Sequence, residues 1–259
     1  KGSQLGSTFP RGEALREALR ERDLRIAEVY ACLPCTPDGP IDGALETGRT
    51  KLTELHAADG DVLVAALPLS ADRIGWGARA QLADVPRLTD AGVERLARLL
   101  EALGREAVSR GHRLAFHNHV GTYVETAEEL ERLMTVANPE LVGVCLDVGH
   151  LELAGGDPVR ALQRYRERVC HVHLKDVDPA VAERMRTGEI AGFLDGLRER
   201  VFTEIGAGSL DLRGVLGELA VRDYRGWVVI EHDTTWRRPS ESAAISKAVV
   251  DYVLRMMAG

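Results

Sequence analysis

Imidazole and carboxylate side chains recur at four places along the chain, each at or just beyond the end of an apolar segment. The four segments are Phe116–Glu125, Leu146–His150, Cys170–Asp176 and Trp227–Asp233. One such cluster is weak evidence, because Asp and Glu often cap loops and helices. Four in succession indicate a shared site. Mixed nitrogen and oxygen ligands suit Mn²⁺, Zn²⁺, Co²⁺ or Fe²⁺, and they suit Mg²⁺ less well.

The third segment has the most informative pattern. His171, His173 and Lys175 alternate with apolar residues, so in a strand they share one face. Three polar groups on one buried face are hard to explain as packing. Asp147 and Glu231 each end an apolar strand, where an unpaired carboxylate would be costly. These carboxylates therefore need a metal, another cation or strong hydrogen-bond donors.

The first segment allows two interpretations. His117 and His119 are separated by one residue and so share a strand face, and Gly121 permits a sharp turn after them. Thr122 and Glu125 have the spacing of a capping box for the next helix. On the sequence alone, Glu125 is either a helix cap or a functional carboxylate.

Seven strand-like segments alternate with longer helical patterns. The expected strands are Gly2–Leu5, Leu24–Cys32, Asp61–Leu67, Arg113–His117, Val142–Asp147, Val169–Leu174 and Trp227–Glu231. The expected helices are Arg11–Arg22, Ala44–Ala58, Asp90–Arg110, Thr126–Val136, Pro158–Arg166, Asp211–Ala220 and Ser240–Met257. This alternation predicts an α/β fold with right-handed crossovers.

Of the two α/β architectures that fit, we favour the (β/α)8 TIM barrel. A dinucleotide-binding open sheet should show G-x-G-x-x-G after an early strand, whereas Gly206-Ala207-Gly208 lies late in the chain. With seven strands visible, we expect the barrel's first strand to be absent from this chain. No linker or shift in composition divides the sequence, which predicts a single domain over residues 1–259.

Composition narrows the class further. The chain has 33 basic and 40 acidic residues, a net charge of −7, which argues against binding to nucleic acid. Its longest apolar run, Val62–Leu69, is too short to span a membrane. Four cysteines are too few for a disulfide scaffold, and we expect a cytoplasmic protein. Cys32 and Cys35 form a C-x-x-C, which we interpret as two thiols in a loop.

Together the motifs resemble those of the xylose isomerase-like TIM barrel superfamily, which includes sugar phosphate isomerases and epimerases. They are His-Asn-His-x-Gly-Thr-x-x-Glu, Leu-Asp-x-Gly-His, His-Val-His-Leu-Lys-Asp, Glu-x-Gly-x-Gly and Val-Ile-Glu. Within the superfamily the chain is most similar to the inosose (2-keto-myo-inositol) dehydratase branch. The resemblance covers most of the chain from Gly2 to about Asp233.

The resemblance implies one divalent metal, with Mn²⁺ the first choice. The implied ligands are Glu125, Asp147, His173 and Glu231, with His119 as the alternative to Glu125. The implied catalytic residues are Glu231, Lys175 and His150, of which Glu231 would serve as ligand and base together. The implied substrate contacts are His117, His119, His171 and Trp236.

The implied reaction removes the proton beside a carbonyl of a keto-sugar or keto-cyclitol, giving an enediolate. Reprotonation would make the protein an isomerase or epimerase, and loss of a β-hydroxyl would make it a dehydratase. Two alternatives remain open: a non-catalytic sugar-binding barrel, and an abasic-site endonuclease, which would need a trinuclear zinc site. The resemblance also allows a homodimer, although nothing in the sequence defines the interface.

Overall fold

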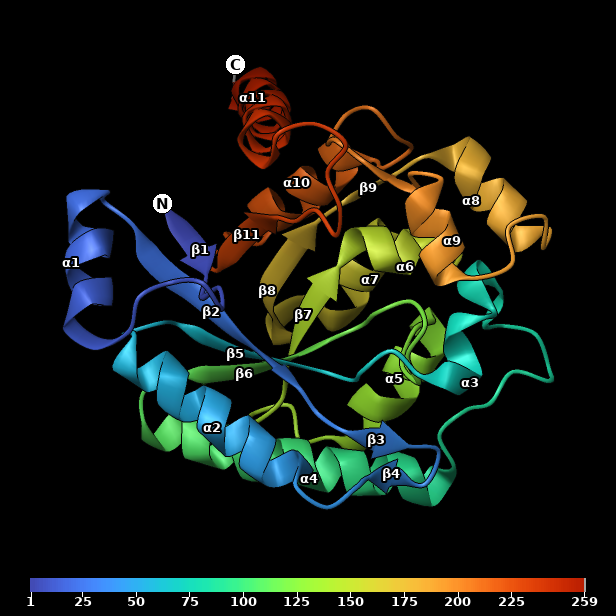
Figure 1. Ribbon diagram of the computed structural model, residues 1–259, viewed down its shortest axis with the longest axis horizontal. Coiled ribbons are helices and arrows are strands. Elements are labelled where there is room, and N and C mark those ends of the chain that lie inside the picture. Colours follow the sequence, from blue (N-terminus) through green and yellow to red (C-terminus); the bar gives the residue numbers. More distant parts are fainter. Residues whose placement is uncertain (259) are drawn as a thin grey trace. The chain divides into compact units, whose positions relative to one another are not determined.

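The computed structural model describes residues 1–258, which form two compact units (Figure 1). Unit 1 consists of Lys1–Pro68, Arg87–His117 and Glu131–Cys145. Unit 2 consists of Leu69–Pro86, Asn118–Leu130 and Leu146–Gly259. The chain passes between the units several times, and the expectation of a single domain stays a prediction.

Seven strands are hydrogen-bonded in one sheet in the order in which they occur in the chain. They are β1 (Gly2–Gln4), β2 (Arg25–Cys32), β5 (Val62–Ala66), β6 (Arg113–His117), β7 (Gly143–Asp147), β8 (Val169–Leu174) and β11 (Trp227–Ile230). The ladders β1–β2, β2–β5, β5–β6, β6–β7 and β8–β11 are parallel. All seven strands were predicted. In several of them, such as β5 and β8, a continuous apolar or fully buried run marks a strand that is covered on both faces.

Unit 1 contains β2, β5 and β6 as well as complete helices. They are α1 (Gly12–Glu21), α2 (Ala44–Ala57) and α4 (Asp90–Ser109), and a short hairpin joins β3 (Cys35–Thr36) to β4 (Gly39–Pro40). Helices α2 and α4 lie side by side, with α2 on β2 and α4 on β6 (Figure 1). The hydroxyl of Thr89 caps α4, and the chain turns at Gly111, whose φ is +82°. The predicted helix over Asp90–Arg110 is therefore confirmed.

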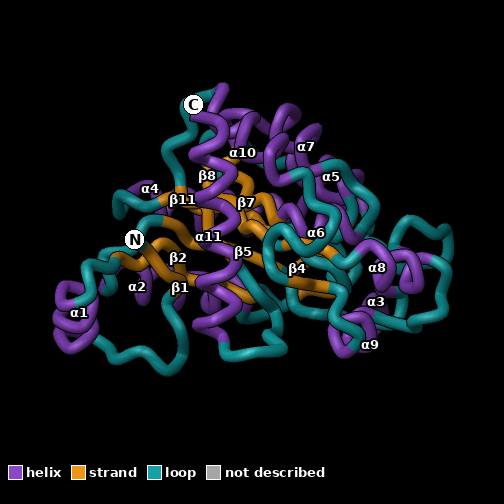
Figure 2. Tube along the Cα trace, turned by 90° about the horizontal axis from the view of Figure 1, so that it is seen from above, coloured by secondary structure: helices purple, strands orange, loops and turns teal. Residues whose placement is uncertain are grey.

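Unit 2 contains β8 and β11 and most of the remaining helices. They are α3 (Ala71–Ile74), η1 (Gly77–Arg79), α6 (Val148–Leu153), α7 (Pro158–Tyr165), η2 (Arg166–Arg168), α8 (Pro179–Arg186), α9 (Phe193–Arg198), α10 (Leu212–Val221) and α11 (Pro239–Ala258). Helix α10 packs against α7 and α11 (Figure 2). Helix α5 (Ala127–Val136) begins in unit 2 and ends in unit 1.

Four short helices, α3, α6, α8 and α9, were not predicted. They have four to eight residues each, too few for a 3.6-residue apolar period to stand out. Helices α8 and α9 pack on a small apolar core of unit 2 that includes Val120, Met185, Phe193 and Phe202. These two helices are flanked in the chain by β9 (Asp176–Val177) and β10 (Phe202–Thr203), which pair as a two-stranded antiparallel ribbon.

The loop at Gly206 and Gly208 has a structural role. The backbone N–H groups of both glycines donate to Oδ2 of Asp176, which is 1% exposed. A phosphate-binding loop needs such N–H groups for its ligand. Here the carboxylate of Asp176 already accepts these N–H groups, which agrees with the prediction that this is not a nucleotide-binding loop.

Candidate active site

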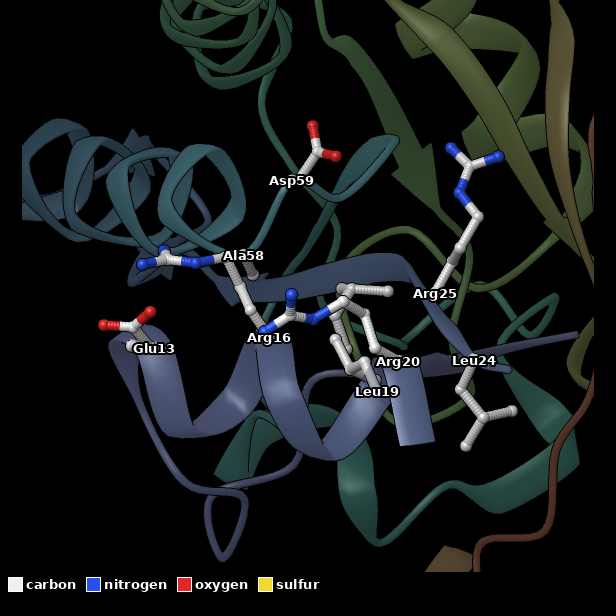
Figure 3. A pocket seen from close by; sticks show the side chains of 9 residues that line it. Glu13, Arg16, Leu19, Arg20, Leu24, Arg25, Ala58 and Asp59 are labelled. Atoms are coloured by element: carbon white, nitrogen blue, oxygen red, sulfur yellow. The ribbon is translucent and has the colours of Figure 1, made fainter. Parts of the chain in front are cut away.

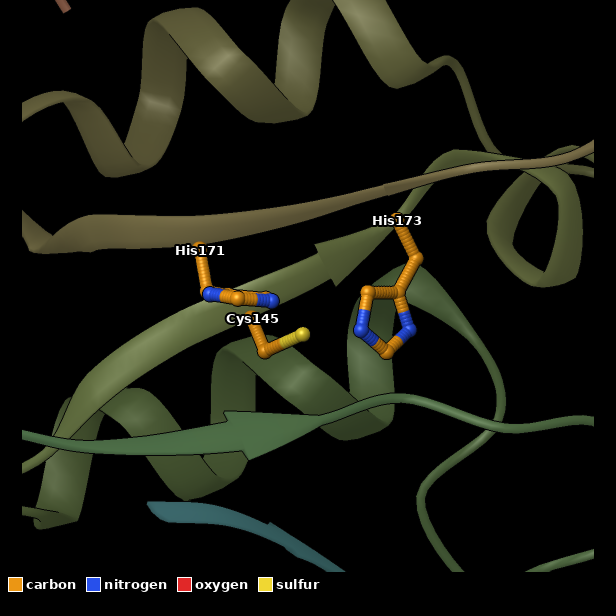
Figure 4. A group of neighbouring side chains, drawn as sticks. All are labelled: Cys145, His171 and His173. Atoms are coloured by element: carbon orange, nitrogen blue, oxygen red, sulfur yellow. The ribbon is translucent and has the colours of Figure 1, made fainter. Parts of the chain in front are cut away.

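Strand β8 carries the alternating polar residues that the sequence singled out. His171 and His173 are fully buried, and their rings project from the same face of β8 with centroids 5.3 Å apart (Figure 4). Lys175 follows the strand directly and is 1% exposed. Cys145, also drawn in Figure 4, belongs to β7 and is buried. Strand β8 thus carries two imidazoles, and the residue that follows it carries an ammonium group.

Two carboxylates from other strands meet His173. Its Nδ1 atom lies 2.9 Å from Glu231 Oε2 and 3.8 Å from Asp147 Oδ2. Ligand atoms of Asp147, His173 and Glu231 all lie within 4.8 Å of one another, a spacing that would let them bind one ion. The group brings together the ends of β7 and β8 and the residue that follows β11.

Asp147 is held in place by its surroundings. Its Oδ1 accepts a hydrogen bond of 2.8 Å from the backbone N–H of His150, so Asp147 caps α6. The Asn118 amide donates to the backbone carbonyl of Asp147 and accepts from its N–H, at 3.2 and 3.1 Å. The cap and the metal ligand were alternative interpretations of Asp147. In the structure one oxygen caps the helix while the other faces His173.

Lys175 is the cation among these carboxylates. Its Nζ lies 2.9 Å from Asp233, 3.3 Å from Glu231 and 3.4 Å from Asp147. Burial opposes the charge of Lys175, but the three carboxylates outweigh it and hold the pKa well above its ordinary value. For Asp233, burial and the charges of Glu231 and Asp147 outweigh the attraction of Lys175 and raise the pKa.

This charge balance makes the group a suitable site for a divalent metal. Three carboxylates lie within 3.4 Å of one ammonium here, and such a concentration of carboxylate oxygens attracts a cation. Asp147, His173 and Glu231 offer two oxygens and one nitrogen, a donor set that suits first-row transition ions. The residues present therefore fit the metal that the motifs imply.

His150 is fully buried and contacts both the backbone and Lys175. Its Nδ1 accepts from the backbone N–H of Val120 at 3.3 Å, and its Nε2 lies 2.9 Å from Lys175 Nζ. The same Nε2 lies 3.6 Å from Asp233 Oδ2. The edge of Phe202 packs against the ring, with centroids 5.0 Å apart.

Glu125 is fully buried but lies elsewhere in unit 2. Its Oε2 accepts a 2.8 Å hydrogen bond from the N–H of Gly121 and lies 3.4 Å from Arg73 Nη2. Burial raises the pKa of Glu125 to about 8, more than Gly121 and Arg73 lower it, and Glu129 adds to the rise. Within residues 1–258, none of the groups of three or more ligand-type side chains includes Glu125.

The capping box forms one turn later than the sequence indicated. Thr122 and Glu125 have the right spacing, but helix α5 begins at Ala127. The box is instead made by Thr126 and Glu129: the Glu129 N–H donates to Thr126 Oγ1, and the Thr126 N–H donates to Glu129 Oε2. The capping interpretation of Glu125 is wrong, because Gly121 and Arg73 hold its carboxylate.

The predicted substrate contacts have varied surroundings. His119 and His171 both lie in unit 2, and His119 stacks on His150 with centroids 3.7 Å apart. His117 ends β6 in unit 1, where it is buried with its ring edge 5.7 Å from that of Tyr30. Trp236 is 43% exposed. Its ring lies beneath the guanidinium of Arg200, 4.9 Å away, on the surface of unit 2.

Sequence reasoning missed two charged residues. Asp233 lies two positions beyond Glu231, and a period of two would have placed both carboxylates on one face. Arg73 is 0% exposed and pairs with Glu129 at 2.7 Å. The charged, turn-like sequence around Arg73 gave no sign of this burial, because only the fold brings α3 to the start of α5.

A cavity of about 420 Å³ in unit 1 has a different lining (Figure 3). It lies between α1 and the first residues of β2, and Arg16, Arg20 and Arg25 line it together with apolar side chains. It lies at the starts of strands, whereas the active sites of such folds lie at the strand ends.

Cys32 and Cys35 are free thiols, and burial raises the pKa of each, that of Cys35 to about 12. Such thiols are poor redox nucleophiles.

Among residues 1–258, every helix is too short or too polar to cross a bilayer.

Comparison with known proteins supports the resemblance seen in the motifs. The family model described as "Xylose isomerase-like TIM barrel" matches residues 5–253. An inosose dehydratase of Lacticaseibacillus casei is 32% identical over 99% of this chain and 86% of that protein. The crystal structure of 3-keto-D-glucoside 4-epimerase YcjR from E. coli matches 97% of this chain and 98% of that chain, with a TM-score of 0.70 and 17% identity.

The fold of the IolI protein, whose crystal structure is described as having a binding zinc atom, is also similar. It matches 93% of this chain and 84% of that chain, with a TM-score of 0.64 and 16% identity. These matches and the ordered parallel strands confirm the predicted α/β fold class. The chain therefore belongs to the xylose isomerase-like TIM barrel family.

Proposed function

We propose that this protein is a divalent-metal-dependent dehydratase of a keto-cyclitol, with inosose as the first substrate to test. The observation that carries the proposal is the group of buried Asp147, buried His173 and half-buried Glu231 with the ammonium of Lys175 beside it. Relatives named inosose dehydratase support a sugar-modifying enzyme and suggest the substrate. We propose Mn²⁺ as the metal, with Zn²⁺, Co²⁺, Fe²⁺ and Mg²⁺ as the alternatives.

In this proposal Asp147, His173 and Glu231 hold the ion. The ion would supply Lewis-acid polarisation of the substrate carbonyl, which makes the neighbouring C–H more acidic. Lys175 keeps its charge because three carboxylates surround it, so its ammonium can donate a hydrogen bond to the leaving β-hydroxyl and stabilise the negative charge that develops there. His150 is held beside Lys175 by the hydrogen bond that its Nδ1 accepts from the Val120 N–H. Elimination needs such a donor, whereas epimerisation returns a proton to carbon.

The test is loss of water from inosose. Purified protein stripped with EDTA and reloaded with Mn²⁺ is incubated with inosose in D₂O, and the products are read by mass spectrometry and NMR. A product lighter by one water that forms only with metal supports the proposal. Recovered substrate that has exchanged its α-proton without losing water would indicate an epimerase or isomerase. Binding of inosose without exchange or water loss would indicate a sugar-binding protein.

The ligand assignment has a matched control. Asp147 and Asp157 both cap helices, accepting from the N–H of His150 and Arg160 respectively. Asn can keep either cap, so Asp147→Asn and Asp157→Asn each remove only a charge. We expect Mn²⁺ binding in calorimetry to weaken strongly in Asp147→Asn and to stay unchanged in Asp157→Asn. Equal affinities in the two variants would contradict the ligand assignment.

A further inference from the structure

The cavity of about 420 Å³ in unit 1 combines an apolar inner wall with charged side chains (Figure 3). Leu19, Ile26 and Ala58 are buried and form the inner wall, and half-buried Leu24 lies beside them. The volume falls within the range of about 300–1,000 Å³ that is usual for small-molecule sites. The cavity is therefore large enough for a ligand of the size of a monosaccharide.

Two guanidinium groups reach this cavity from one face of α1. Arg16 and Arg20 are four residues apart, so they lie on neighbouring turns on the same side of the helix. Arg25, from the start of β2, also lines the cavity but pairs with Asp61 at 2.7 Å. Within residues 1–258, no carboxylate lies within 4.0 Å of the guanidinium of Arg16 or Arg20. Two like charges so placed repel each other, and an anion bound between them would relieve the repulsion.

Two carboxylates line the same cavity without neutralising these arginines. Glu13 precedes Arg16 by three residues on α1, and Asp59 follows the end of α2. The same spacing produces an ion pair in α2, where Lys51 and Glu54 lie 3.0 Å apart. In the part of the chain that the structure describes, however, no cation lies within 4.0 Å of the carboxylate of Glu13 or Asp59. Charges of both signs thus border one cavity and stay available to a ligand.

The lining determines which ligand chemistry fits. Guanidinium groups bind phosphate oxygens through charge-assisted hydrogen bonds, and carboxylates accept hydrogen bonds from hydroxyl groups. The apolar inner wall suits the C–H face of a sugar ring. None of the nine lining residues is aromatic, so the cavity offers no stacking partner for a nucleobase. This combination fits a molecule that carries a phosphate and several hydroxyl groups on a small carbon skeleton.

We propose that this cavity binds a small phosphorylated polyol, such as a sugar phosphate. Arg16 and Arg20 hold the phosphate, while Glu13 and Asp59 accept hydrogen bonds from the hydroxyl groups. The inference goes beyond the proposed function and does not depend on it. All the lining residues belong to unit 1, whereas the proposed metal ligands belong to unit 2. The cavity is therefore a second site, separate from the candidate active site.

Calorimetry with glucose 6-phosphate as the probe tests the arginines. Wild-type protein is compared with a double variant, Arg16→Gln with Arg20→Gln, and with Arg22→Gln. All three arginines are exposed and Gln is a good helix former, so both variants should fold. Arg22 follows α1 outside the cavity lining, so Arg22→Gln is the matched control for a lost charge. We expect the double variant to weaken binding at least about tenfold, and Arg22→Gln to change it less than about twofold.

Two simpler probes test the carboxylates. Inorganic phosphate lacks the polyol, and glucose lacks the charge. We expect glucose 6-phosphate to bind wild-type protein at least about tenfold more tightly than either probe. In Glu13→Ala the preference for glucose 6-phosphate over inorganic phosphate should fall, because an acceptor for its hydroxyl groups has been removed. Glu13 is exposed, so this variant should also fold.

The results that would overturn the proposal are distinct. Equal affinity of wild-type protein and the double variant for glucose 6-phosphate would place the ligand elsewhere. Weaker binding in Asp147→Asn would place it at the proposed metal site. Equal affinity of wild-type protein for glucose 6-phosphate and inorganic phosphate would leave only a general attraction for anions.

A phosphate group can also belong to a lipid. Sedimentation with phosphatidylcholine vesicles that contain phosphatidylinositol 4-phosphate therefore completes the test. We expect the vesicles to leave the protein in solution while glucose 6-phosphate binds. Co-sedimentation of wild-type protein that the double variant abolishes, without binding of glucose 6-phosphate, would make the site a lipid headgroup site and overturn the proposal.

Discussion

The buried carboxyl of Glu125 should make the stability of this protein depend on pH in the neutral and alkaline range. Glu125 is 0% exposed, and its pKa is raised to about 8, mainly by burial. In the unfolded chain the same group ionises near its ordinary value of 4.5. Between these values the folded protein holds a proton that the unfolded chain releases. The stability that this proton provides is complete below pH 4.5 and is lost as pH rises through about 8.

The magnitude follows from the two pKa values. Each pH unit between them removes about 1.4 kcal/mol from the free energy of unfolding, and the loss levels off above the folded pKa. Integrated from about pH 6 to about pH 9, the loss from Glu125 alone is about 3 kcal/mol. With a urea m-value of about 3 kcal/mol per M, this moves the unfolding midpoint down by about 1 M.

The test compares urea unfolding of wild-type protein, Glu125→Gln and Glu128→Gln across this pH range. Gln has the shape of the protonated carboxyl and cannot ionise, so Glu125→Gln should lose about 3 kcal/mol less than wild type between about pH 6 and about pH 9. Glu128 is three positions along, on the exposed side of α5. Its Gln variant should follow the wild-type curve. Parallel curves for Glu125→Gln and wild type would refute the reasoning.

Four further predictions concern metal binding, the buried ion pair, helix packing and the thiols. Asp147→Asn should weaken Mn²⁺ binding at least tenfold, while Glu125→Gln should leave it unchanged in calorimetry, since Glu125 lies outside the ligand group. Arg73→Met should cost about 3–5 kcal/mol in urea unfolding, because it leaves the buried carboxylate of Glu129 without its cation. Gly104→Ala should destabilise unit 1 by about 1–3 kcal/mol, because its Cβ would overlap a backbone carbonyl before β7. Cys35 should react with iodoacetamide more slowly than a free thiol at neutral pH, as its raised pKa leaves little thiolate.

Local sequence patterns were sufficient for most of the fold. The alternation of strand-like segments with longer helical patterns located all seven strands of the sheet. The period of two that joins His171, His173 and Lys175 was readable for the same reason, since it depends only on strand geometry. The short helices α3, α6, α8 and α9 were not predicted, because tertiary packing and caps stabilise them and their sequences show no clear helical period.

The sequence by itself determined which residue types would occur at the ends of the strands, and hence the family. Only the tertiary structure decided which of them meet. Glu125 pairs with Arg73, 52 residues earlier, and that contact removes it from the ligand group. Lys175 pairs with carboxylates as far along the chain as Asp233, 58 residues later. Such contacts depend on distances between atoms in the folded chain, to which a pattern along the sequence has no access.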